Sequence, residues 1–457
     1  MTYHLAIDIG ASSGRHILGW LENGVLKLKE IYRFDNNVTM SENGLVWDIE
    51  HLVSEVFAGI KECKKHDIVP ETVAIDTWAV DYVLLDKDEK EIYPVFAYRN
   101  SRTSKVIGEV ENIISPCELY SLTGLQKLDF NTIYQLYCDK LDGRLDNAQY
   151  FLMIPAYLSY KLTGIIKNEY TNASTTQLVN AKEKTWDNSL IERLGLPSHL
   201  FDQLCMPGDL IGEFSDEIQK MMGFNSKVIF CPSHDTASAV AACPIKDNDM
   251  YVSSGTWSLI GTENREPILT DEAMKYNFTN EGGIEYRFRF LKNYMGMWLF
   301  QNIRRNLDKK YTYDEMMEMA MACETIHYID VNDPSFTAPE NMIDAIRNYL
   351  KMPDLDLASV INSVYHSLAK SYVTATNEME TVTGKTISRI SIVGGGSCDT
   401  YLNQLTAKYT GKPVTAGPKE ATAIGNLITQ VMYSNSEYSL QDMRGIIEKS
   451  FNIQEVK

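Results

Sequence analysis

The order of the apolar runs at the N-terminus constrains the fold of this chain more than any other feature. From Tyr3 onward, apolar and polar positions alternate in three short runs, and Asn23-Gly24 between the last two is typical of a two-residue hairpin turn. Helical spacing of apolar residues then predicts a helix over 50–65, and a buried strand is predicted over 73–76. Three hairpin strands, a helix and a strand open an actin-like lobe, whereas strict alternation would indicate a Rossmann sheet.

The second half of the chain repeats this plan. A strand-like run from Tyr251 to Ile260 begins again around a glycine, followed later by a long helix (358–383) and a strand (387–393). At 457 residues the chain exceeds the size at which one core stops growing, so we expect two lobes with a ligand cleft between them. A proline and a polar run place the boundary near residue 245, which predicts two domains, 1–245 and 246–457.

Composition excludes several classes of protein. A formal net charge of -18, with no tract rich in arginine or lysine, leaves no cationic surface for a nucleic acid. The eight cysteines form no CxxC pair and no cluster with histidines, so we expect reduced thiols. No basic leader or apolar span is apparent. We therefore expect a soluble, cytoplasmic protein without membrane partners, either a monomer or a homodimer.

Three segments rich in glycine and serine could hold a nucleotide. In 8–15, glycines allow a tight turn while hydroxyls and amides can donate to phosphate oxygens. It is no Walker loop, because no Gly-Lys-Ser/Thr follows, and a plain hairpin turn is the alternative. The run 253–258 repeats the same chemistry in the second half, which predicts one phosphate loop per lobe. Gly394-Gly395-Gly396 follows a predicted strand, where backbone could approach an adenine or a ribose.

Two aspartates are candidates for the chemistry. Asp235 follows an apolar strand and precedes a helix of small residues, so it could either cap that helix or accept a hydroxyl proton during attack on the γ-phosphorus of ATP. A lost cap costs roughly 1 kcal/mol, whereas a lost general base costs about a hundred- to ten-thousand-fold in rate. Asp8 could hold the waters of a Mg²⁺ ion that bridges the phosphates, or merely fix the hairpin turn.

A sugar site needs directional polar groups and usually an aromatic face. The run 76–81 offers two carboxylates and Trp78 at the end of a predicted strand. Asp81 could receive sugar hydroxyls, while Trp78 could equally be a core residue. Asn293 is a further hydroxyl partner or a turn residue.

Eight ordered segments spread over most of the chain resemble the FGGY family of carbohydrate kinases: DIGASSGR (8–15), IDTWAVD (75–81), FNTIYQL (130–136), EYTNASTTQLVN (169–180), SHDTASAV (233–240), SSGTWSL (253–259), LKNYMGMWLFQ (291–301) and VGGG (393–396). The resemblance implies two ribonuclease-H-like lobes and MgATP in the cleft between them. The subgroup that these segments resemble most transfers phosphate to the 1-hydroxyl of L-rhamnulose.

The resemblance also implies site residues. Asp235 matches the proton acceptor of the family. Its ATP contacts match Ala11, Ser12, Ser13, Gly14, Arg15, Thr256, Gln301 and Gly395, and positions lining the sugar match Ala79, His234, Thr236 and Asn293. The chain departs from the pattern at Ala79, where a glycine is expected, at Asn100, where an aspartate is usual, and at Tyr286, a small-residue position. Those departures put the particular sugar in doubt more than the chemistry.

Three alternatives stay open from the sequence. The kinase could act on another ketose, L-fuculose or D-xylulose. An actin-like ATPase without a sugar substrate could use the same phosphate loops, although no client-binding domain is apparent. A catalytically silent sugar sensor is disfavoured, because both Asp8 and Asp235 are present.

Overall fold

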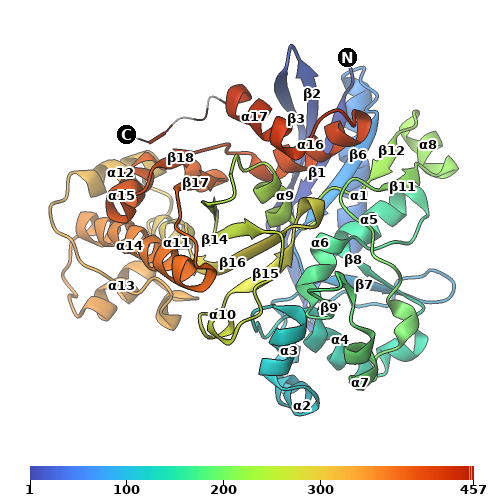
Figure 1. Ribbon diagram of the computed structural model, residues 1–457, viewed down its shortest axis with the longest axis horizontal. Coiled ribbons are helices and arrows are strands. Elements are labelled where there is room, and N and C mark those ends of the chain that lie inside the picture. The colour runs from blue at the N-terminus through green and yellow to red at the C-terminus, as the bar shows by residue number, and fades with distance from the viewer. Residues whose placement is uncertain (452, 454, 457) are drawn as a thin grey trace. The chain divides into compact units, whose positions relative to one another are not determined.

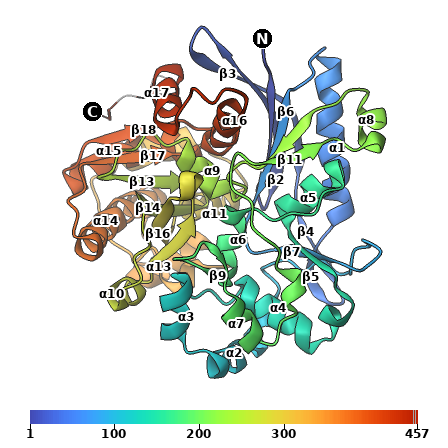
Figure 2. The same ribbon diagram turned by 45° about the vertical axis from the view of Figure 1, so that its right-hand side comes forward.

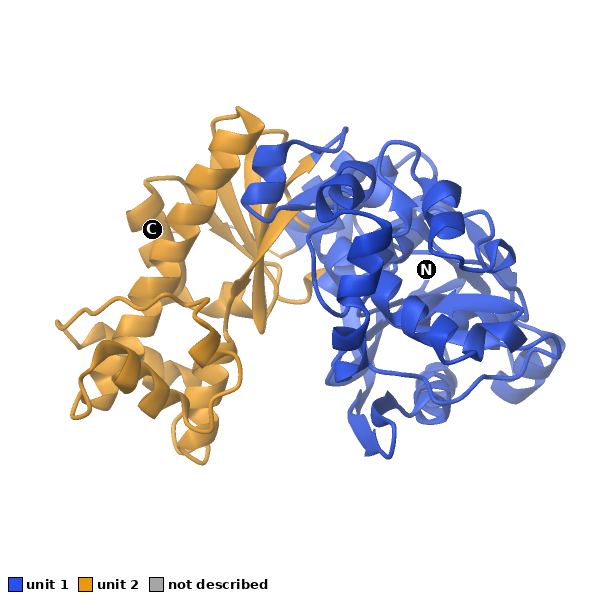
Figure 3. Ribbon diagram, turned by 90° about the horizontal axis from the view of Figure 1, so that it is seen from below, with its two compact units in different colours: residues 1–242, 264–290, 422–450 blue, residues 243–263, 291–421, 451–457 orange. Residues whose placement is uncertain are grey.

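The computed structural model describes residues 1–451, 453, 455 and 456, and divides into two compact units. Unit 1 comprises residues 1–242, 264–290 and 422–450, whereas unit 2 comprises 243–263, 291–421 and the last described residues (Figure 3). The predicted boundary near residue 245 lies close to the first change of unit, which follows residue 242. A single boundary does not account for the segments 264–290 and 422–450, which also belong to unit 1.

Unit 1 is built on a six-stranded sheet in the order β11-β12-β6-β1-β2-β3 (Figure 1). Its strands are β1 (His4–Ile9), β2 (Ser13–Glu22), β3 (Val25–Asp35), β6 (Thr72–Thr77), β11 (Leu210–Glu213) and β12 (Lys227–Ile229). The predicted meander is confirmed, because β2 pairs antiparallel with both β1 and β3. Asn23 and Gly24 both take positive φ, 53° and 72°, as this hairpin turn requires.

Three two-stranded sheets, twelve α-helices and several short 3₁₀ helices complete unit 1 among the described residues. The strand pairs are β4 (Val38–Ser41) with β5 (Gly44–Trp47), β7 (Tyr82–Leu85) with β8 (Tyr150–Met153), and β9 (Val179–Asn180) with β10 (Thr185–Trp186). The helices are α1 (Ile49–Lys65), α2 (Ile107–Ile113), α3 (Pro116–Thr123), α4 (Thr132–Leu141), α5 (Ile154–Thr163), α6 (Tyr170–Ala173), α7 (Asn188–Arg193), α8 (Asp216–Met222), α9 (Asp235–Ala241), α10 (Asp271–Lys275), α16 (Ala421–Ser434) and α17 (Leu440–Ser450).

Two helices distant in sequence cover opposite faces of the unit 1 sheet. Helix α1, where a helix is predicted, places Leu52, Val56 and Ile60 in the large core that also contains Leu5 and Ile7 of β1. Helix α16 packs Ala423 and Leu427 against Ala6 and Ile17 on the other face. Neighbouring positions along β1 point to opposite faces, so each helix buries its own half of that strand.

The second sheet has the order β15-β16-β14-β13-β17-β18, and Figure 2 shows its strands from β18 to β16 side by side. The strands are β13 (Asp249–Ser254), β14 (Trp257–Asn264), β15 (Thr279–Gly282), β16 (Phe288–Met295), β17 (Arg389–Val393) and β18 (Val414–Ala416), of which β15 and the start of β16 belong to unit 1. The helices of unit 2 are α11 (Trp298–Asn306), α12 (Tyr313–Met321), α13 (Met342–Leu350), α14 (Leu357–Thr383) and α15 (Thr400–Thr410).

The strand-like run 251–260 is two antiparallel strands rather than one. β13 and β14 pair through Ser254 and Ser258, with a hairpin at Gly255-Thr256. The long helix and the strand predicted after it are confirmed as α14 and β17, and β17 pairs parallel with β13.

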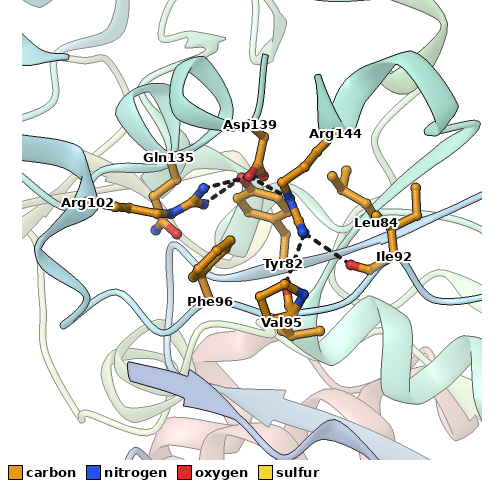
Figure 4. A pocket seen from close by; sticks show the side chains of 10 residues that line it. Tyr82, Leu84, Ile92, Val95, Phe96, Arg102, Gln135, Asp139 and Arg144 are labelled. Atoms are coloured by element: carbon orange, nitrogen blue, oxygen red, sulfur yellow. Dashed lines mark hydrogen bonds and ion pairs between the residues drawn. The ribbon is translucent and has the colours of Figure 1, made fainter. Parts of the chain in front are cut away.

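Asp139 forms ion pairs with two largely buried arginines in unit 1 (Figure 4). Its Oδ1 lies 2.5 Å from Nη1 of Arg102 and 2.8 Å from Nε of Arg144, while its Oδ2 accepts a hydrogen bond of 2.5 Å from the hydroxyl of Tyr82. Arg144 also donates to the carbonyls of Ile92, Tyr93 and Pro94. This cluster lines a small cavity and ties α4 to the segment that follows β7.

All eight cysteines are free thiols. No helix within the described part of the chain is long and apolar enough to cross a membrane.

Gly425 sets the distance between α16 and α9. A Cβ atom built on this residue would lie 1.7 Å from the carbonyl oxygen of Ser238, which is far closer than atoms can approach. Gly425→Ala is therefore expected to force the two helices apart and to lower the free energy of unfolding by at least about 1–3 kcal/mol.

Chemical denaturation of this variant, compared with Gly445→Ala, tests the close approach. Gly445 lies on α17, where an added Cβ atom would meet nothing within 4 Å, so alanine there should be neutral or stabilise the helix. Equal stability of the two variants would contradict the close packing of α16 on α9.

Candidate active site

The first predicted phosphate loop is the turn between β1 and β2. The amide of Gly10 donates to the carbonyl of Ser13 at 2.9 Å, and the side chain of Asn36 donates to the carbonyl of Gly10 at 2.8 Å. Ala11 and Ser13 are half-buried and Ser12 is exposed, so the loop offers hydroxyls to a ligand. Gly14 lies inside β2, where a Cβ atom would come within 2.2 Å of the ring of Phe34, so packing alone requires a glycine there.

Asp8 and Arg15 form an ion pair beside this loop. Nε and Nη2 of Arg15 donate to Oδ2 of Asp8 at 3.0 and 2.8 Å. Asp8 is registered opposite Asp76 across the parallel strands β1 and β6, so both carboxyl groups lie on one face of the sheet. Arg15 therefore offsets only part of the negative charge that gathers there.

Asp76 is the most deeply buried carboxyl group near the loop. Its Oδ2 accepts a hydrogen bond of 2.6 Å from Asn426, whereas its Oδ1 has no hydrogen-bond partner among the described residues. Burial, and next the negative charge of Asp8, raise the pKa of Asp76 well above its usual range. An unpartnered carboxyl oxygen beside a second carboxylate fits the surroundings of a magnesium ion, which prefers oxygen ligands and keeps several waters. No three potential ligand side chains of the described residues converge on one point, so such an ion would be held partly through water.

Asp235 is the first residue of α9, and His234 occupies the N-cap position. Oδ1 of Asp235 accepts hydrogen bonds from the amide of Thr236 at 2.6 Å and from its hydroxyl at 3.1 Å. The Asp235 side chain is 31% exposed, and Nε2 of His234 lies 3.4 Å from its Oδ1. This partial exposure leaves the carboxylate open to a ligand.

The loop before α9 is held by Glu169, a residue that sequence reasoning missed. Its buried carboxylate accepts hydrogen bonds from the hydroxyl and amide of Ser233 and from the hydroxyl of Thr171. The side-chain amide of Asn172 donates to the carbonyls of Trp78 and Ser233. Glu169, Thr171 and Asn172 belong to the segment EYTNAS, which was noted in the sequence only because it resembles a motif of the family. A carboxylate followed by hydroxyl and amide side chains could have indicated that this segment holds a neighbouring loop by hydrogen bonds.

The carboxylate of Asp81 is fully buried, and it already accepts hydrogen bonds from other residues of the protein. It accepts hydrogen bonds from Nε1 of Trp47 at 2.7 Å, Nε1 of Trp78 at 2.9 Å, and the amide of Tyr98 at 3.1 Å. Burial raises its pKa to about 6, although these hydrogen bonds act in the opposite direction. Asp81 thus organises the two tryptophans, whose rings lie 4.2 Å apart, while Ala79 beside them is half-buried. Direct contact of Asp81 with a sugar stays a prediction that this burial disfavours.

Unit 2 carries the second group of predicted ATP residues. The hydroxyl of Thr256, in the β13–β14 hairpin, lies 3.5 Å from Oε1 of Gln301 on α11. A Cβ atom on Gly396 would come within 2.0 Å of Oγ of Ser254, whereas one on Gly395 would meet nothing within 4 Å. Packing therefore requires a glycine at Gly396, and Gly395 is the open position of the cluster.

The remaining predicted positions are spread over both units. Asn293 lies in β16, in the part assigned to unit 2, and its buried Oδ1 has no hydrogen-bond partner among the described residues. Of the other two departures from the family pattern, Asn100 caps a short 3₁₀ helix and Tyr286 is exposed.

Comparison with known proteins identifies the family. Residues 3–242 match the N-terminal domain, and residues 250–434 the C-terminal domain, of the FGGY family of carbohydrate kinases. The chain belongs to this family. Among related FGGY proteins, the rhamnulokinase of Oceanobacillus iheyensis is 45% identical over 98% of this chain and 97% of its own length. That of Halalkalibacterium halodurans is 45% identical over 99% and 98%, and that of Bacillus subtilis 40% over 98% and 94%.

Two solved structures of other kinases share the fold of this chain. A ligand-bound xylulose kinase from Lactobacillus acidophilus superposes with a TM-score of 0.80 at 15% identity, covering 100% of this chain and 93% of that one. A glycerol kinase from Plasmodium falciparum with ADP gives a TM-score of 0.77 at 13% identity, covering 100% and 94%. At such low identity these likenesses show the fold alone, and they confirm the predicted actin-like α/β architecture of two lobes.

Proposed function

We propose that this FGGY kinase transfers the γ-phosphoryl group of ATP to the 1-hydroxyl of L-rhamnulose, giving L-rhamnulose 1-phosphate in the breakdown of L-rhamnose. The observation that carries the reaction is the partly exposed carboxylate of Asp235 at the start of α9. The choice of sugar is supported by relatives named rhamnulokinase at 37–45% identity. We also propose that the enzyme acts in the cytoplasm, as a monomer or a homodimer.

Residues of both units are proposed to hold ATP. Hydroxyls and amides of the β1–β2 loop would donate to the phosphates, and Thr256, Gln301 and Gly395 would complete the nucleotide contacts. In domain terms, 1–245 would bind the sugar and supply the first phosphate loop, and 246–457 would bind the rest of ATP. Asp8, with Asp76 beside it, would hold a magnesium ion through water, and that ion would supply positive charge to neutralise the phosphates.

The protein's own groups account for the acid–base step. The sugar would be lined by Ala79, His234, Thr236 and Asn293, so that its terminal hydroxyl faces Asp235. Asp235 would accept the proton of that hydroxyl as its oxygen attacks the γ-phosphorus. The two hydrogen bonds from Thr236 hold the carboxylate in one orientation, which favours transfer without reorganisation.

A ketose panel tests the proposed function. Purified protein with MgATP is expected to form ADP only when a ketose is present, with the highest kcat/KM for L-rhamnulose among L-rhamnulose, L-fuculose and D-xylulose. D-xylulose lacks the C6 methyl group, and a missing methyl in a fitted pocket is worth about ten- to two-hundred-fold in kcat/KM. ADP formation that is equal with and without sugar would contradict a sugar kinase, and a higher kcat/KM for another ketose would correct the substrate.

A further inference from the structure

Arg289 is a fully buried cation next to the candidate active site. It lies in β16, within the part assigned to unit 1, and no part of its side chain is exposed. Nε donates to the carbonyl of Gly282 at 2.9 Å, and Nη2 lies 2.9 Å from Oε2 of Glu281. Burying a guanidinium is costly unless it is paired and hydrogen-bonded, so Glu281 explains how Arg289 can be there. Glu281 does not explain what the cation does.

The remaining contact of Arg289 is with His234. Nη2 of Arg289 lies 3.0 Å from Nδ1 of the imidazole, closer than the 3.4 Å between that nitrogen and Glu281. A guanidinium can only donate hydrogen bonds, so Nδ1 must accept with its lone pair. The proton of the neutral imidazole then resides on Nε2, because which nitrogen carries it is set by the bond that the other one makes.

Glu281 keeps this arrangement electrically balanced. Burial by itself raises the pKa of Glu281, but the positive charge of the Arg289 guanidinium beside it acts in the opposite direction, and the pKa lies well below its usual range. Glu281 is therefore an anion at any pH where the enzyme works, and Arg289 remains a donor toward His234. The chain of contacts runs from Glu281 through Arg289 to His234 and ends at Asp235, all within unit 1.

Nε2 of His234, the nitrogen that would carry the proton, lies beside the carboxylate of Asp235. Nε2 lies 3.4 Å from Oδ1 of Asp235, the same oxygen that accepts two hydrogen bonds from Thr236. Donors gathered around Oδ1 leave Oδ2 as the oxygen for an incoming hydroxyl proton. A histidine with its proton on Nδ1 would instead turn a lone pair toward the carboxylate and repel it.

We propose that Arg289 and Glu281 are positioning residues for the phosphoryl transfer, which act by fixing His234 as the Nε2–H tautomer that orients Asp235. This inference rests on the proposed function, and it concerns residues that the sequence analysis did not single out. A purely structural ion pair, with no influence on His234, is the alternative outcome.

The tautomer of His234 can be read directly by NMR. In protein labelled with ¹⁵N-histidine, long-range ¹H–¹⁵N spectra should give His234 the pattern of a neutral Nε2–H imidazole, assigned by its loss in His234→Gln. The double variant E281Q/R289M removes both charges together, so no uncompensated charge is buried. We expect its His234 signals to shift toward a mixture of tautomers.

The same double variant should lower kcat for the ketose by about ten- to a hundred-fold, the range known for removing the groups that orient metal-bound histidines. KM for ATP should not change, because no predicted ATP contact is touched. Arg287→Gln, which removes an arginine paired with Glu285 two residues earlier in the chain, is the matched control and should leave both readouts as in the unaltered protein.

Two results would overturn the proposal: an unchanged His234 pattern in the folded double variant, or an unchanged kcat. If the double variant does not fold, Arg289→Lys supplies the same two measurements, because it keeps the charge but loses the planar fork. Absence of activity on every ketose in the unaltered protein would contradict the proposed function. The NMR pattern would still establish the tautomer of His234 in that case.

Discussion

Asp235→Asn is expected to lower kcat by about a hundred- to ten-thousand-fold, which is the contribution of a general base. Asparagine has the same shape and can still accept the hydrogen bond that the amide of Thr236 makes to Oδ1. It cannot take up the proton of the sugar hydroxyl. KM for ATP and KM for the ketose should therefore change little, although kcat falls strongly. Steady-state kinetics with a coupled ADP assay measures both parameters.

Asp216→Asn is the matched control for this variant. Asp216 is also the first residue of a seven-residue helix of unit 1, α8, and it is exposed. Both variants remove one negative charge from a helix N-terminus, a change worth about 0.3–1 kcal/mol of stability. Only Asp235→Asn should affect turnover. A value of kcat within ten-fold of the unaltered protein would mean that Asp235 serves as a helix-terminal residue and not as the base.

Asp139→Asn is expected to lower the free energy of unfolding by about 3–5 kcal/mol, the cost of breaking a buried ion pair by removing one partner. The substitution leaves the guanidinium groups of Arg102 and Arg144 side by side, with no carboxylate between them (Figure 4). Urea denaturation of the purified protein measures the effect.

Asp142→Asn supplies the comparison for Asp139→Asn. Asp142 follows the last turn of the same helix, α4, is exposed, and should change stability by no more than about 0.5 kcal/mol. The double variant Asp139→Leu with Arg102→Met should recover part of the loss, because it removes one of the two unpaired cations together with the anion. Equal midpoints for Asp139→Asn and Asp142→Asn would show that the cluster contributes little to stability.

Local patterns predicted much of the fold because they report local forces. The Asn23-Gly24 turn and the alternation around it specified β2 and β3, since both residues tolerate the positive φ that the turn needs. Helical spacing of Leu52, Val56 and Ile60 located α1 for a similar reason, because these residues share one face. The same reasoning merged β13 and β14 into one run, because the hairpin at Gly255-Thr256 lacks a strong turn signature.

Local sequence patterns could not predict the contacts between segments that are distant in the chain. The single boundary near 245 followed from a polar stretch, yet α16 returns to unit 1 and its Gln430 lies within 2.6 Å of Thr72. Asp81 looked available to a sugar, and only packing revealed the two indole donors that occupy it.

The sequence by itself determined the order of the elements, the family and the residues of the candidate chemistry, because motifs and periodicity are written in neighbouring positions. Only the tertiary structure decided which buried polar groups face one another. Arg289 and His234 are far apart in sequence and lie 3.0 Å apart in space. A buried guanidinium needs hydrogen-bond acceptors around it, and the whole fold decides which acceptors reach it.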